Sequence, residues 1–106
     1  MTGYQITFYT QQNRLHRGKP VAEWLIHLAS ELGLRGATVI PASEGIGHHH
    51  RIHSARFFEL ADQPLSVVAI VDEEENRRLF ERLQQEQVHL FYCKVPVEFG
   101  VIGKEE

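Results

Sequence analysis

The chain has 106 residues, of which 42% are hydrophobic and 24% charged, and its formal net charge is -3 with neutral histidines. This length predicts a single domain, residues 1–106, and the acidic balance argues against nucleic acid as a default partner. No apolar stretch is long enough to cross a membrane, and the single cysteine, Cys93, excludes an internal disulfide and fits a cytoplasmic location.

The first half of the chain predicts a strand, a helix and a second strand. Apolar and polar residues alternate over Tyr4–Tyr9, as in a half-buried strand. A polar stretch, Thr10–Lys19, is predicted as a loop. Pro20 then suits the first turn of a helix, and Gly33 suits its end. Between them the apolar residues have helical spacing: Val21, Trp24, Leu25, Leu28, Ala29 and Leu32. Ala37–Pro41 is a short strand.

Residues 42–64 are predicted to form a long irregular connection, with an extended piece over 55–60. Connections of this length in compact domains are commonly functional or disordered. This one contains two glycines in the order Gly45-Ile46-Gly47. A run of histidines follows them: His48, His49, His50 and His53.

The second half repeats the strand–helix–strand order. Leu65–Val71 is a strand with apolar side chains on both faces. Asp72 and Glu75 have the spacing of a capping box, which predicts the start of a helix. This helix is predicted to end near Gln87. The predicted buried stripe of this helix is Leu79, Phe80 and Leu83. Val88–Val97 is predicted as the last strand.

This order predicts an α+β fold, the ferredoxin-like βαββαβ sandwich, with a four-stranded antiparallel sheet and two helices on one face. Two helices cover only one side of a sheet. An apolar patch would therefore remain exposed on the other side, formed by Val68, Ile70, Leu90 and Tyr92. Monomers rarely keep such a patch, so we expect other copies of the chain to cover it.

Several segments together carry a family resemblance. They are GYQITFYT (3–10), GKPVAEWLIHLASELGLRGATV (18–39), GIG (45–47), RIHSARFFEL (51–60), QPLSVVAIVDEEE (63–75) and the terminal KVPV. With them the chain resembles the PII-like family, small proteins related in fold to the PII nitrogen-signalling regulators. The resemblance implies a homotrimer whose sheets face the centre. It also implies that residues 42–55 correspond to the T-loop, through which PII proteins contact target proteins.

The resemblance further implies a ligand site in the cleft between subunits. The base of the T-loop lines the nucleotide site of PII proteins, and four residues of this chain match it: Thr38, Gly45, Ile46 and Gly47. Arg51 lies in the adjacent segment. PII proteins also carry a loop rich in glycine and lysine before the last strand. Here that connection is Glu86-Gln87-Val88, with neither residue type. The ligand, a nucleotide or another anion, and any cofactor are therefore left open.

The residue types alone leave alternatives at each candidate site. Gly45-Ile46-Gly47 is either a turn or a backbone cradle for an anion. The loop histidines are either metal ligands or part of a solvated, protonatable loop: His48, His49, His50 and His53. The basic stretch from Arg14 to Lys19 is either a solvated loop or an anion site before the first helix.

No enzyme signature is present: the chain has neither a Gly-x-Ser-x-Gly elbow nor a P-loop. Our hypothesis is a non-enzymatic, cytoplasmic, homotrimeric signalling protein that binds a small ligand at subunit clefts and signals through residues 42–55. One alternative is a trimeric protein that binds divalent metal through the loop histidines. Another is an interaction module without a ligand.

Overall fold

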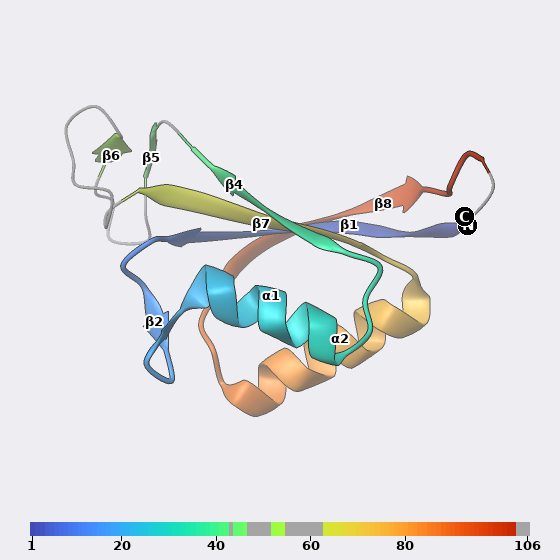
Figure 1. The fold of residues 1–106 in the computed structure, drawn as a ribbon, viewed down its shortest axis with the longest axis horizontal. Coiled ribbons are helices and arrows are strands. Elements are labelled where there is room, and N and C mark those ends of the chain that lie inside the picture. Colours follow the sequence, from blue (N-terminus) through green and yellow to red (C-terminus); the bar gives the residue numbers. More distant parts are fainter. Residues whose placement is uncertain (43, 47–51, 55–62, 104–106) are drawn as a thin grey trace.

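The computed structural model describes residues 1–42, 44–46, 52–54 and 63–103. Four strands form one antiparallel sheet in the order β4-β7-β1-β8, and both helices pack against one face of it (Figure 1). Two short hairpins, β2–β3 and β5–β6, form separate sheets. The elements are β1 (Thr2–Gln11), β2 (Leu15–His16), β3 (Lys19–Pro20), α1 (Val21–Glu31), β4 (Ala37–Pro41), β5 (Glu44–Ile46), β6 (Ile52–Ser54), β7 (Pro64–Val71), α2 (Glu73–Glu86) and β8 (Phe91–Glu98). The predicted ferredoxin-like sandwich is confirmed.

The hydrophobic core lies between the helices and the sheet. Alternate residues of β1 and β7 face the helices, while the predicted stripes of α1 and α2 face the sheet. The half-buried Trp24 and Phe80 pack against the edge of this core, as expected. Its buried members are Ile6, Phe8, Val21, Ala22, Leu25, Leu28, Leu65, Val67, Ala69, Val71, Leu79 and Leu83.

The predicted capping box starts α2. The Asp72 carboxylate accepts from the Glu75 backbone N–H at 2.8 Å, and the Glu75 carboxylate accepts from the Asp72 N–H at 2.9 Å. Arg35 donates to both carboxylates, at 2.9 Å to Asp72 and 3.1 Å to Glu75. The hydrogen bond from the Glu75 backbone is the main reason that the pKa of Asp72 is lowered. The contact with Arg35 therefore ties the start of α2 to the segment between α1 and β4.

The stretch predicted as a loop, Thr10–Lys19, contains more order than expected. β1 continues to Gln11, and β2 pairs with β3 in a two-residue hairpin. Its central residues, Arg17 and Gly18, have φ values of 52° and 79°. A type I′ turn requires positive φ at both positions, and its twist suits a hairpin. Strands of two residues are too short to produce a readable periodicity, which explains the error.

The last strand begins later than predicted, and its two faces are reversed. Val88 and Leu90 pack against the core before β8 begins at Phe91. In the antiparallel register with β1, Tyr92 lies opposite Phe8, on the side of the helices. Leu90 and Tyr92 therefore do not belong to the uncovered face, whereas Val68 and Ile70 do.

Cys93, which an apolar strand interior would bury, is exposed in the subunit. It lies opposite Thr7, a position of β1 that points away from the helices. Among the described residues, no helix has the length and apolar character that a membrane span requires.

Candidate functional site

The segment between β4 and β7, which includes residues 42–55, starts and ends at the same end of the main sheet. The Ala42 N–H donates to the Pro64 carbonyl at 2.9 Å, so the two ends of the segment lie side by side. The Gln12 N–H donates to the Gln63 carbonyl, also at 2.9 Å, which ties the returning chain to β1. Figure 1 shows the β5–β6 hairpin beyond this end and the β2–β3 hairpin below it. We call this region the loop end of the sheet.

The residues predicted to bind ligand are divided between two sheets. Thr38 is exposed in β4 and lies opposite Val68, on the face without helices. Gly45 and Ile46 belong to β5, where the backbone of Gly45 pairs with His53 and that of Ile46 with Ile52. The structure thus brings Gly45 and His53 together as backbone partners. Gly47 and Arg51 lie outside the described residues.

The predicted metal ligands are only partly described. His48, His49 and His50 lie outside the described residues, and the backbone of His53 belongs to β6. Within the part of the chain that the structure describes, no three His, Cys, Asp or Glu residues are arranged to hold a metal ion. The metal hypothesis therefore keeps its status as a prediction.

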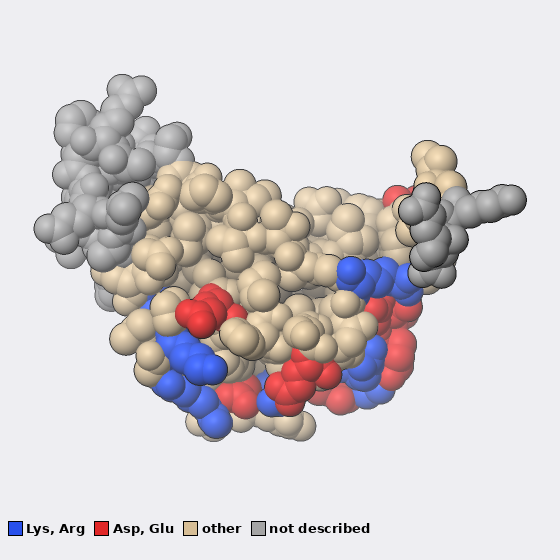
Figure 2. Space-filling view, in the orientation of Figure 1, with Lys and Arg blue, Asp and Glu red and all other residues tan. Residues whose placement is uncertain are grey.

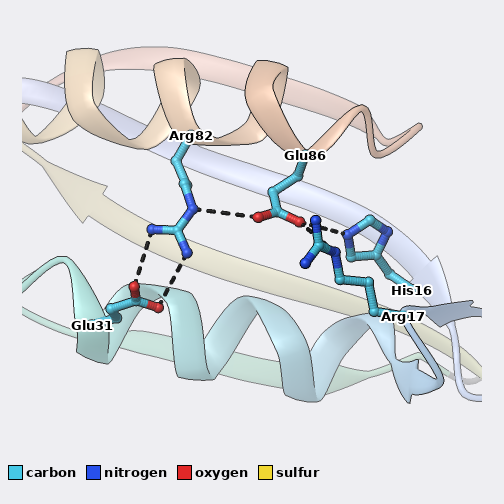
Figure 3. Close-up of polar contacts among 5 residues, drawn as sticks. All are labelled: His16, Arg17, Glu31, Arg82 and Glu86. Carbon is cyan, nitrogen blue, oxygen red and sulfur yellow. Dashed lines mark hydrogen bonds and ion pairs between the residues drawn. The ribbon is translucent and has the colours of Figure 1, made fainter.

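A charged network near the loop end was not predicted (Figure 3). Glu86, at the end of α2, contacts His16 at 3.1 Å, Arg17 at 3.0 Å and Arg82 at 3.4 Å. Arg82 also binds Glu31 of α1 at 3.1 Å. The network joins the β2–β3 hairpin to both helices. His16 and Glu86 are 70 positions apart in the chain, so no local motif could have revealed the contact.

His16 is held from two sides. Its ring lies 4.5 Å from the ring of Trp24, measured between centroids, while Glu86 contacts its Nε2 atom. Only 15% of the His16 side chain and 11% of the Glu86 side chain are exposed, so water screens this pair less than an ion pair on the surface. His16 is thus packed into the fold, whereas Arg17 keeps 69% of its side chain exposed while it contacts Glu86.

The network predicts a pH-dependent contribution to stability. The pKa of Glu86 is lowered, chiefly by its hydrogen bond to His16 and also by Arg17 and Arg82. A lowered pKa in the folded state stabilises the fold at pH values above the ordinary carboxyl value of 4.5, and the effect is lost as the pH falls through the folded value. We expect Glu86→Gln to unfold at a lower temperature than the wild type at pH 7. The difference between the two unfolding temperatures, measured by circular dichroism, should shrink below about pH 4.5.

A matched control for this experiment is Glu81→Gln. Glu81 also pairs with an arginine, Arg77, but on the exposed surface of α2. Its loss should change the unfolding temperature less than the loss of Glu86. Equal effects of the two substitutions at every pH would contradict a special role for the network.

The face of the sheet opposite the helices, which we call the open face, is strongly apolar. Strand register places Tyr9 opposite Phe91 on this face, with ring centroids 5.6 Å apart. Phe91 is 70% exposed in the subunit and Ile70 36%. Figure 2 shows the charged side chains gathered over the helical layer, while the part of the view above it contains few. The open face therefore has the character of a surface that another protein surface covers.

Comparison with solved structures identifies the class of fold. One similar structure is that of CPII, a nitrogen regulatory PII-like protein from Thiomonas intermedia K12, bound to ADP, AMP and bicarbonate. It matches with a TM-score of 0.70 and 19% sequence identity, and the match covers 95% of this chain and 91% of CPII. A protein from Thermus thermophilus, described as a putative PII-like signaling protein, matches with a TM-score of 0.66 and 22% identity, over 92% of this chain and 88% of its own. The fold is that of the PII-like proteins, as the sequence resemblance implied.

Comparison of sequences gives the family. The model of the DUF190 family, described as "Uncharacterized ACR", matches residues 3–93. A UPF0166 protein from Aquifex aeolicus (strain VF5) is 36% identical over 75 residues, which is 71% of each chain. The chain belongs to the DUF190 family.

Proposed function

We propose that this protein is a PII-like regulatory protein that carries out no catalysis of its own. In this proposal it binds a small anionic ligand, a nucleotide or a simple oxyanion, in clefts between the subunits of a homotrimer. Binding then alters how residues 42–55 contact a target protein. The observation that carries the proposal is the fold, which the chain shares over 95% of its length with CPII, a protein bound to ADP, AMP and bicarbonate.

Two features of the subunit support this role. The segment between β4 and β7 has both ends hydrogen bonded into the sheet, so a ligand at its base would act on a well-defined anchor. The open face offers an apolar surface for other copies of the chain, with Phe91, Val95 and Ile40 each more than one third exposed. A change in the order of a segment on ligand binding is an established mode of signalling.

The proposal is tested by a thermal-shift screen with ADP, AMP and bicarbonate, followed by calorimetric titration of each compound that stabilises the protein. A ligand that binds the folded state raises the unfolding temperature to an extent set by its affinity and concentration. We expect at least one of the three to do so. If none binds, the proposal is wrong.

The metal alternative is tested by adding zinc and nickel to the same screen. The wild type is compared with a variant in which His48, His49 and His50 are changed to alanine.

The glycines of the loop base give a more specific prediction. Gly47→Ala should weaken binding of the stabilising ligand about tenfold or more, because an added methyl group hinders close approach of the backbone to a ligand. Gly36→Ala is a suitable control, since a Cβ at Gly36 meets nothing within 4 Å. Unchanged affinity in Gly47→Ala, measured by calorimetry, would remove Gly47 from the site.

A further inference from the structure

Arg14 differs from the other arginines near the loop end in its partners. Arg17 and Arg82 each pair with carboxylates, and both contact Glu86. The guanidinium of Arg14 instead donates to the backbone carbonyl oxygen of His89. Within the described part of the chain, no carboxylate lies within ion-pair distance of Arg14. Burial lowers its pKa from the ordinary value, and burial is the only cause of that shift.

The backbone holds Arg14 at a defined place in the fold. Its carbonyl oxygen accepts from the Val21 N–H at 2.9 Å, which fixes the residue beside the start of α1. Its side chain extends to His89, 75 positions later, in the connection between α2 and β8. That connection, residues 87–90, contains neither lysine nor arginine. Arg14 therefore places a guanidinium group at a connection that has no lysine or arginine of its own.

The two neighbouring basic side chains already have a carboxylate partner. His16 and Arg17 are both engaged by Glu86, and Glu86 is the residue at which α2 ends. Figure 2 shows basic side chains beside the β2–β3 hairpin, with acidic side chains close to them. Of Arg14, Arg17 and Arg82, Arg14 is the one without a carboxylate partner among the described residues.

A guanidinium group carries five N–H donors in a planar fork that matches two oxygens of a carboxylate, bicarbonate or phosphate. His89 accepts from one nitrogen of Arg14, Nη2. A partly desolvated cation without a counter-ion is unfavourable, and a bound oxyanion would remove that cost. We propose that Arg14 binds the oxyanion group of the ligand at the loop end. This inference rests on the proposed function and names the residue that holds the charged part of the ligand.

The experiment compares the wild type, Arg14→Gln and Arg77→Gln by calorimetric titration with ADP, inorganic phosphate and bicarbonate, at an ionic strength held constant with chloride. Arg77 is the control, because it lies on the exposed surface of α2 and pairs with Glu74 and Glu81. We expect Arg14→Gln to bind the oxyanion about tenfold or more weakly, and Arg77→Gln to match the wild type.

Arg14→Lys keeps the inference testable if Arg14→Gln does not fold. Lysine keeps the charge but not the planar fork, so binding should again be weaker than in the wild type. A loss confined to ADP and phosphate identifies a phosphoryl group, and a loss confined to bicarbonate identifies a carboxylate-like group; either supports the inference. Wild-type affinity in both Arg14 variants, or an equal loss in Arg77→Gln, overturns the role of Arg14 and leaves the proposed function standing. If none of the three compounds binds the wild type, both are wrong.

Discussion

Ile70→Glu is expected to convert the proposed homotrimer to a monomer at micromolar concentration. Ile70 lies on the open face of β7, an inner strand of the sheet, and it is 36% exposed in the subunit. In the proposed assembly a carboxylate there would be buried without a partner, at a cost of several kcal/mol in each subunit. Light scattering coupled to size-exclusion chromatography measures the mass of both proteins. Circular dichroism then shows whether the monomer keeps its fold.

The matched control is Leu15→Glu. Leu15 is also a large apolar residue, 61% exposed, but it belongs to the β2–β3 hairpin and not to the open face. Its substitution should leave the mass of the particle unchanged. A trimer in both variants would show that assembly does not use the open face, and a monomeric wild type would contradict the proposed trimer itself.

Gly3→Ala is expected to destabilise the fold by about 2–3 kcal/mol, which is the upper end of the range for substitutions that add atoms to a well-packed site. A Cβ at Gly3 would lie 1.9 Å from the Val71 carbonyl oxygen and 2.9 Å from the Cα of Asp72. These are backbone atoms at the junction of β7 and α2, so they cannot move aside as the end of a flexible side chain can. The unfolding temperature should fall by roughly 10 °C or more, as measured by calorimetry.

Gly36→Ala again provides the control, because the space around Gly36 is open and its φ is not positive. Alanine there reduces the conformational freedom of the unfolded chain, so this variant should be unchanged or slightly more stable. Equal unfolding temperatures for the two variants would show that the strand and the start of α2 can separate at little cost.

Features that depend on local pattern were predictable from the sequence. The stripe of α1, the capping box of Asp72 and Glu75, and the limits of β4 all follow from residues close together in the chain, and the structure confirms them. The split order of strands and helices was enough to predict the sheet with both helices on one face. The family resemblance extended this to the class of fold.

Features that depend on pairing between distant segments were not predictable. The last strand was predicted, but only its register with β1 decides that Tyr92 faces the helices and Phe91 does not. Likewise, nothing near Glu86 in the sequence indicates that His16 and Arg17 would meet it. The glycines of the candidate site stay a prediction, as does the anion site considered for the basic stretch from Arg14 to Lys19. The contact of Arg14 with His89, which lies 75 positions later, could not be predicted from the sequence.

The hydrogen bond between Ala42 and Pro64 has a consequence for how such proteins can diverge. Because the chain leaves and re-enters the sheet at neighbouring positions, the entropic cost of closing the intervening segment rises only slowly with its length. The register of β4 with β7 is set by the strands themselves, from Ala37 opposite Ala69 to Pro41 opposite Leu65. Insertions, deletions and exchanges between these anchors can thus accumulate without disturbing the core. Related chains are therefore free to differ in this segment while they keep the same sheet and helices.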